Sequence, residues 1–244
     1  MHFTMKNAVE NNPDKRVIFI GDQTNKFVSK YGVEHHLYDD YISPEFVSRF
    51  DISYRIVGGS EFVRLNNGKG EKDWTRFNFL KHHVLYEFCK KNNINSLWLF
   101  DSDVLFCKRL SKFEHLVQDY DYGTIYNHKV YQGYMSNIEH LQEFCECVIK
   151  CYNNSKLLND LLENEFKSNP KWGFTMMRAW KIFHDLVKPN TYDLVKNPLD
   201  GLYYDPGIAL KQSELTKYNG SQVKELYLLK NGTLTNDIAI LSFD

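Results

Sequence analysis

Short apolar runs alternate with longer amphipathic stretches along this chain, and the alternation predicts its secondary structure. Val17–Gly21 and Ser96–Phe100 are short runs of β-branched, leucine and aromatic residues, which is typical of buried strands. Ile52–Gly59 and Tyr122–Tyr126 have a similar character, so we expect strands there as well. The run Ser96–Phe100 is apolar on both faces, as the central strands of parallel sheets are.

Longer stretches carry apolar residues at helical spacing. Asp73 can cap a helix over 74–92, and Ser136 with Glu139 forms an S-x-x-E capping box ahead of a second helix. A third helix is expected within 174–187. The apolar stripe of the first helix is Phe77, Leu80, Val84, Leu85 and Phe88, and that of the second is Ile138, Leu141, Phe144, Cys145, Val148, Ile149 and Tyr152.

The order of these elements predicts the fold class. Strands alternate with helices in the first half, which indicates an α/β sheet. Val223–Phe243 resembles two strands joined by a turn at Asn231-Gly232. Because no linker rich in Gly, Ser or Pro divides the chain, we expect one domain over 1–244.

Composition narrows the class of protein. The chain has 244 residues, of which 43% are hydrophobic and 25% charged, as in soluble globular proteins. Its net charge of −1 argues against a nucleic-acid binder with a basic face. No stretch approaches the roughly 20 apolar residues of a membrane span. The first residues contain no apolar signal region and the five cysteines are an odd number, so we expect a cytoplasmic protein.

A cysteine cluster and a histidine pair are each more consistent with packing than with metal binding or catalysis. Cys145, Cys147 and Cys151 form a C-x-C-x3-C cluster without a matching ligand pair elsewhere, so we expect buried thiols and no metal site. His82 and His83 are adjacent on the first predicted helix and therefore point in different directions, which predicts packing roles for both.

Leu97–Phe106, LWLFDSDVLF, is the segment most indicative of chemistry. Asp101 and Asp103 follow an apolar strand, and residues two apart in an extended chain point to the same side. The carboxyl ends of strands are where ligands bind in open α/β sheets. Two carboxylates can hold Mg²⁺ or Mn²⁺ when a diphosphate completes the coordination. The alternative is that Asp101 and Asp103 form only a polar turn.

Two enzyme classes place a D-x-D motif after such a strand. In phosphatases of the haloacid dehalogenase type the motif lies near the N-terminus, and a second acidic pair follows downstream. No convincing acidic pair follows here, and 100 residues precede Asp101. That position favours a nucleotide-sugar glycosyltransferase of the GT-A type, which has a nucleotide-binding half of about this length. A phosphatase, a sugar nucleotidyltransferase and a non-catalytic nucleotide-sugar-binding domain are kept as alternatives.

Arg76-Phe77, the helix behind them and LWLFDSDVLF together resemble the GT-A glycosyltransferases, including glycogenin-like, bacterial and viral members. The resemblance implies a GT-A-like (Rossmann-like) single domain with a mixed, mainly parallel central sheet flanked by helices. Its nucleotide-binding half would be 1–106 and its donor-sugar and acceptor half 107–244. The enzyme would transfer a sugar from a nucleoside-diphosphate donor, with UDP-sugars favoured, to a hydroxyl of a glycan or other acceptor.

The resemblance also implies roles for particular residues. Asp101 and Asp103 would bind Mn²⁺ or Mg²⁺, and Asp205 or Asp185 would supply a catalytic base. The segment His128–Asn137 matches the part that lines the donor-sugar pocket, where Tyr131 and Tyr134 could stack on a sugar. The residues expected to contact the nucleotide or the donor sugar are Gly21, Asp22, Arg76, Ser102, Gln132 and Gly133.

The sequence departs from the family at two places. Glycogenin-like relatives carry a histidine near the C-terminus that completes the metal shell, and Ser242 stands at that position here. Other members have an acidic residue at the start of the late helix, where this chain has Phe174–Met177. We therefore expect weaker metal binding, and no residue is assigned to the acceptor side.

Overall fold

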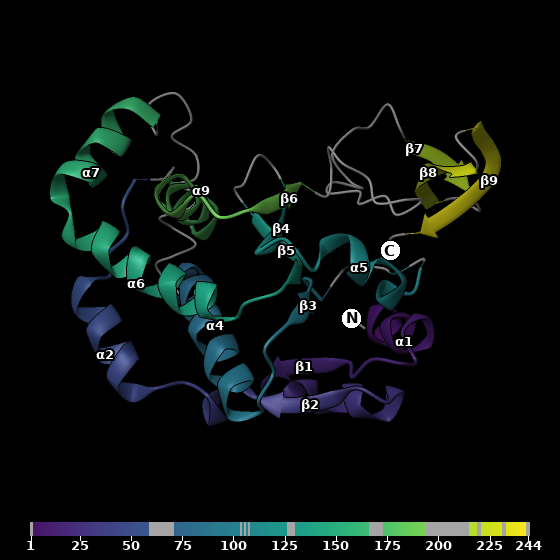
Figure 1. Ribbon diagram of the computed structural model, residues 1–244, viewed down its shortest axis with the longest axis horizontal. Coiled ribbons are helices and arrows are strands. Elements are labelled where there is room, and N and C mark those ends of the chain that lie inside the picture. The colour runs from purple at the N-terminus through teal and green to yellow at the C-terminus, as the bar shows by residue number, and fades with distance from the viewer. Residues whose placement is uncertain are drawn as a thin grey trace. The chain divides into compact units, whose positions relative to one another are not determined.

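The computed structural model describes the backbone of residues 2–58, 71–102, 104, 106, 108–125, 130–165, 173–193, 215–218, 221–230 and 233–242 (Figure 1). The chain divides into two compact units, Met1–Tyr192 and Asp193–Asp244, and each is described by itself. The predicted D-x-D segment lies in the first unit. Whether the chain forms the single domain expected from the sequence stays a prediction.

The first unit begins with a parallel strand pair. β1 (Ile18–Gly21) pairs with β2 (Glu34–Leu37), with Ile18 opposite Glu34. The 3₁₀ helices η1 (Gln23–Tyr31) and η2 (Tyr38–Asp40) follow the two strands. The prediction of a strand at Val17–Gly21 is confirmed. β2 was not predicted, because its sequence EHHL lacks an apolar alternation.

The second sheet of this unit has four strands, in the order β3-β5-β4-β6. Its strands are β3 (Leu97–Leu99), β5 (Val130–Met135), β4 (Tyr122–Ile125) and β6 (Thr191–Asp193). The chain is therefore α/β, as predicted. Within the described strands, however, β5 runs antiparallel to both β3 and β4, which differs from the mainly parallel sheet expected. Only four residues join β4 to β5, and a parallel pair needs a connection of about a dozen.

Three helices form the core of this unit, and all three were predicted. They are α4 (Glu71–Lys91), α6 (Glu139–Asn153) and α9 (Met176–Val187), which pack against one another. Trp180 of α9 stacks on Phe144 of α6, with ring centroids 4.0 Å apart. The remaining helical segments are α1 (His2–Asn11), α2 (Pro44–Ser53), η3 (Leu110–Phe113), α5 (Glu114–Val117), α7 (Ser155–Asp160) and the π-helical turn η4 (Leu161–Glu165).

Three local predictions are wrong. Asp73 lies within α4 and does not precede it as a cap, because the helix begins at Glu71. Ile52 belongs to α2 and not to a strand, because the Ser43 hydroxyl accepts the amide of Phe46 and Pro44 stands in the first helical turn. The capping box ahead of α6 is also absent: the Asn137 side chain accepts the amide of Glu139, while the Ser136 hydroxyl donates to the carbonyl of Asp121, the residue before β4.

The second unit contributes three antiparallel strands, β7 (Leu215–Tyr218), β8 (Ser221–Lys230) and β9 (Thr233–Ser242). Lys230 pairs with Thr233, so β8 and β9 enclose the two residues at which a turn was predicted. The predicted C-terminal strand pair is confirmed. Among the helices that the structure describes, none is long and apolar enough to cross a membrane.

Candidate functional site

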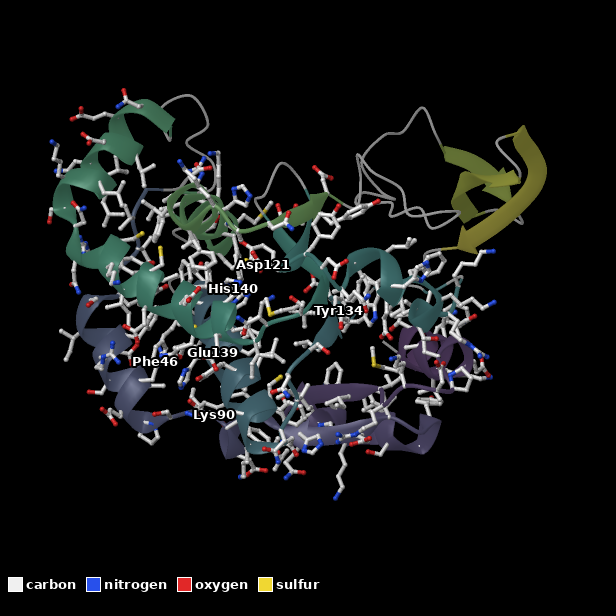
Figure 2. All side chains as sticks on the ribbon, viewed as in Figure 1. Phe46, Lys90, Asp121, Tyr134, Glu139 and His140 are labelled. Carbon is white, nitrogen blue, oxygen red and sulfur yellow. The ribbon has the colours of Figure 1, made fainter. Side chains whose placement is uncertain are left out.

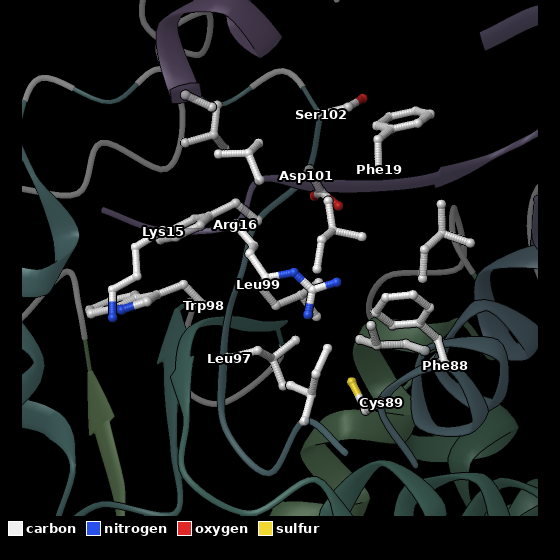
Figure 3. Close-up of a pocket in the computed structure, with 18 of the residues that line it drawn as sticks. Lys15, Arg16, Phe19, Phe88, Cys89, Leu97, Trp98, Leu99, Asp101 and Ser102 are labelled. Atoms are coloured by element: carbon white, nitrogen blue, oxygen red, sulfur yellow. The ribbon is translucent and has the colours of Figure 1, made fainter. Parts of the chain in front are cut away.

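The carboxyl end of β3 opens onto a cavity of about 630 Å³. The chain leaves β3 and turns at Asp101, whose carbonyl accepts the amide of Val104 at 3.2 Å. Asp101 and Ser102 both line the cavity, together with residues of α1, β1, β3 and α4. Figure 3 shows Asp101, Ser102 and Phe19 close together, away from Leu97 in the same cavity. The structure thus brings two of the predicted site residues to one cavity.

Asp101 is available to an incoming ligand. Its side chain is 59% exposed, and its carboxylate lies 3.7 Å from the ammonium of Lys81 on α4. An exposed pair at that distance contributes little stability and can exchange partners. A carboxylate oxygen is also a suitable ligand for Mg²⁺ or Mn²⁺. Asp101 therefore fits a metal site, while Asp103 lies outside the described residues.

Most of the cavity wall is apolar and aromatic. Leu97 and Leu99 of β3 face Phe88 of α4 across it. Tyr38 and Phe77 form an aromatic pair with ring centroids 5.4 Å apart, and both line the cavity. Burial raises the pKa of Tyr38 to about 12, so its hydroxyl remains a hydrogen-bond donor at neutral pH. Such a wall can hold a planar ring next to the polar end at Asp101.

Arg76 is engaged elsewhere. Its guanidinium donates to both carboxylate oxygens of Asp51, at 2.7 and 2.8 Å. Phe77 lines the cavity, whereas Arg76 is not among the described residues that do. Arg76 would have to leave Asp51 to reach a nucleotide there, so its predicted role stays a prediction.

Gly21 and Asp22 each have a structural role. A side chain on Gly21 would bring Cβ within 2.5 Å of the Phe19 ring and 2.7 Å of the Asn25 amide oxygen. Asp22 caps η1, where its carboxylate accepts from the amide and the hydroxyl of Thr24. The hydroxyl bond holds the pKa of Asp22 below its usual value. These contacts give Gly21 and Asp22 structural roles that do not require a bound nucleotide.

Of the remaining predicted residues that the structure describes, Tyr134 lies at the cavity, and Gly133 and Asp185 are not among the residues that line it. Gly133 lies on β5 opposite Leu99 with φ 105°, and the side chain of Gln132 lies outside the described part. Asp185 on α9 is paired with Lys181 four residues earlier, and its side chain is 55% exposed. Asp205 lies outside the described residues. Tyr134 does line the cavity, as its predicted sugar contact requires.

Lys81 and Tyr38 were missed by the sequence reasoning. Lys81 follows Phe77 by four residues, so the helical stripe places both on one side of α4. That spacing could have identified Lys81 as a partner of the carboxylate after β3. Tyr38 had no comparable signal, because β2 in front of it was not predicted.

The metal and cysteine predictions can be examined over the described side chains. Among them, no group of three or more His, Cys, Asp or Glu is arranged to hold a metal, and Asp103 is not part of that set. Four of the five cysteines are free thiols, Cys89, Cys145, Cys147 and Cys151, and the fifth, Cys107, lies outside the described residues. Of the three cysteines predicted to be buried or half-buried thiols, Cys145 and Cys151 are buried and Cys147 is half-buried, as predicted.

No known protein family, functionally characterised protein or solved structure matches this chain. The resemblance to GT-A glycosyltransferases therefore rests on the segment from Arg76 to Phe106 and on the position of Asp101 at the end of β3. Any functional conclusion has to be carried by the cavity and its residues.

Proposed function

We propose that this protein is a metal-dependent glycosyltransferase of GT-A-like fold that uses a nucleoside-diphosphate sugar. The observation that carries the proposal is the position of Asp101 and Ser102 where β3 ends at the cavity. Ligands bind at the carboxyl ends of strands in open α/β sheets, and a D-x-D sequence there supplies oxygen ligands for a cation. We favour a UDP-sugar as donor and a glycan or other hydroxyl compound as acceptor.

We assign the residues of the cavity to the metal, the phosphates, the base and the sugar of the proposed donor. Asp101, with Asp103, would hold Mn²⁺ or Mg²⁺, and Lys81 beside Asp101 would meet a phosphate oxygen. Tyr38 and Phe77 would pack against the base of the nucleotide, and Tyr134 against the sugar. The cation would neutralise the charge that develops on the departing diphosphate.

The proposal is tested by ligand-dependent unfolding temperatures with UDP-, GDP- and dTDP-sugars, each with and without Mn²⁺. A ligand at about 100 times its Kd stabilises the native state by roughly 2.7 kcal/mol. We expect a shift that needs Mn²⁺ and that Asp101→Asn abolishes. Asp160→Asn, which changes an exposed carboxylate on α7, is the matched control and should behave as the wild type.

The possible outcomes separate the alternatives. A shift without transfer or hydrolysis of the sugar would favour a domain that only binds nucleotide sugars. Release of phosphate from a phosphomonoester, lost in Asp101→Asn, would favour a phosphatase. No Mn²⁺-dependent shift with any of the nucleotides would refute the proposed function.

A further inference from the structure

The backbone that follows Asp101 is hydrogen-bonded to side chains of α1 and of Asn12, the residue directly after α1, almost one hundred residues earlier in the chain. The Thr4 hydroxyl donates to the carbonyl of Ser102 at 2.7 Å. Asn12 is buried and accepts the amide of Leu110 at 2.8 Å. The described part of this segment lies between β3 and η3 and has no strand neighbour of its own. The backbone carbonyl of Ser102 finds its partner on α1, and the amide of Leu110 finds its partner on Asn12 directly after α1.

Asn7 contributes the most specific of these contacts. Its amide nitrogen donates to the carbonyl of Phe106 at 3.1 Å, and its amide oxygen accepts the Phe106 amide at 2.7 Å. One side chain thus satisfies both backbone groups of one residue, as a neighbouring strand would. Thr4 lies one turn before Asn7, so the two side chains share a face of α1.

The contact at Ser102 bears directly on the proposed metal site. The Ser102 carbonyl belongs to the peptide that joins Ser102 to Asp103, between the two aspartates of the motif. A hydrogen bond on that carbonyl fixes the rotation of the peptide and hence the direction in which the neighbouring residues leave it. Met5 and Ala8 of α1 also line the cavity at Asp101.

We infer that α1 supports the metal-binding turn, with Thr4 and Asn7 as positioning residues that set its geometry. This inference rests on the proposed function, because the turn binds a metal only if that proposal holds. The contacts themselves do not depend on a ligand. Partners that orient metal ligands typically change metal affinity by about 10- to 100-fold when they are lost.

Four single variants isolate the contacts. Thr4→Val keeps the shape of the side chain and removes the donor, and Thr4→Ser restores the donor. Asn7→Leu removes both bonds to Phe106. Asn11→Leu is the matched control, since the Asn11 side-chain amide donates to the backbone carbonyl of Asn7 within the same helix, and no described contact joins it to the turn.

The first measurement is amide hydrogen exchange in metal-free protein. We expect the Phe106 amide to exchange about tenfold faster in Asn7→Leu, because a backbone amide that loses its partner opens more readily. The Val104 amide should exchange faster in Thr4→Val, and both amides should behave as in the wild type in Asn11→Leu. Unchanged exchange at both amides in Thr4→Val and Asn7→Leu would overturn the inference.

The second measurement is the affinity for Mn²⁺ in the presence of UDP, followed by the electron paramagnetic resonance signal of free Mn²⁺. We expect Thr4→Val to weaken Mn²⁺ binding about tenfold, and Thr4→Ser to restore it. Wild-type affinity in Thr4→Val would overturn the inference while leaving the proposed function intact. If wild-type protein binds no Mn²⁺ with UDP, the proposed function fails, and the exchange data alone then report whether α1 supports the turn.

Discussion

Two regions of the first unit are held in different ways. The helical core, formed where α4, α6 and α9 pack together, consists of buried rings that contact one another, such as Trp180 on Phe144. In the turn segment, Asp101–Leu110, described backbone groups of Ser102, Phe106 and Leu110 are hydrogen-bonded to the side chains of Thr4 and Asn7 on α1 and of Asn12 directly after it. Packing distributes stability over many contacts, whereas each of these hydrogen bonds holds one particular backbone group of the turn segment. The core should therefore govern global stability and the turn segment local order.

The largest expected effect is the loss of a ring from the helical core. Trp180 is almost fully buried, stacks on Phe144 and donates its indole N–H to His82 at 3.2 Å. Trp180→Ala should lower the free energy of unfolding by about 3 to 5 kcal/mol in denaturant titrations. Leu186→Ala, at a side chain on α9 that is 70% exposed, should change it little. Equal losses in the two variants would contradict the assignment of the core.

A smaller effect should appear when the pH is lowered. Burial lowers the pKa of His82 to about 3, below the value of about 6.5 in an unfolded chain. The unfolded state therefore binds more protons between these values, so stability falls as the pH falls below about 6.5. From pH 7 to pH 5 this histidine should account for a loss of about 2 kcal/mol.

Chemical denaturation of wild type and of His82→Gln at pH 7 and pH 5 measures this contribution. The difference between the two losses belongs to His82, because all other titrating groups are shared. His82 is held between Trp180 and the carbonyl of Asn78, so the substitution also lowers stability at pH 7. An identical pH dependence in both proteins would show that His82 is not buried in its neutral form.

The same two regions differ in how far the sequence predicts them. The stripe of apolar residues along 77–88 predicted α4, and comparable stripes predicted α6 and α9. Each stripe marks the face of a helix that packs against neighbouring elements. The prediction of β3 and of a site at Asp101 followed from an apolar run ended by two aspartates. The spacing of apolar residues can be read within one segment of sequence, and the helices of the helical core show that spacing.

The hydrogen bonds that hold the turn segment cannot be recognised from a local sequence pattern. Thr4, Asn7 and Asn12 are ordinary polar residues in sequence, and their partners lie 98 or 99 residues away. The capping of α2 by Ser43 was likewise hidden by the β-branched residues of Ile52–Gly59, which favoured a strand. Long-range hydrogen bonds to backbone depend on the tertiary fold, so single-residue propensity cannot predict them.

A polar contact of the turn segment should cost less than a ring of the core. Asn12 is 3% exposed, accepts the Leu110 amide at 2.8 Å and donates to the Ala8 carbonyl at 3.0 Å. Asn12→Ala leaves a buried amide without its partner, which should cost about 1 to 2 kcal/mol. Thermal or denaturant unfolding measures this loss of stability, with Asn11→Ala, at the neighbouring last residue of α1, as the control. A cost as large as that of Trp180→Ala would remove the contrast between the two regions.

The smallest expected effect concerns the ion pair of Arg76 with Asp51, which belongs to neither region. The two side chains are 30% and 44% exposed, so Asp51→Asn should change the free energy of unfolding by less than about 1 kcal/mol. The more informative measurement on Asp51→Asn is its affinity for UDP. Asp51→Asn releases Arg76, and if Arg76 contacts the diphosphate, the affinity for UDP should rise in calorimetric titrations.

Arg76→Ala completes the comparison, because it removes the guanidinium that Asp51→Asn only releases. A nucleotide role predicts that Arg76→Ala weakens UDP binding by about tenfold, in the range of one charge-assisted hydrogen bond. A purely structural role predicts that both variants bind UDP as the wild type does and lose the same small amount of stability. The direction of the change in UDP affinity, rather than the size of the change in stability, therefore decides whether Arg76 contacts the nucleotide.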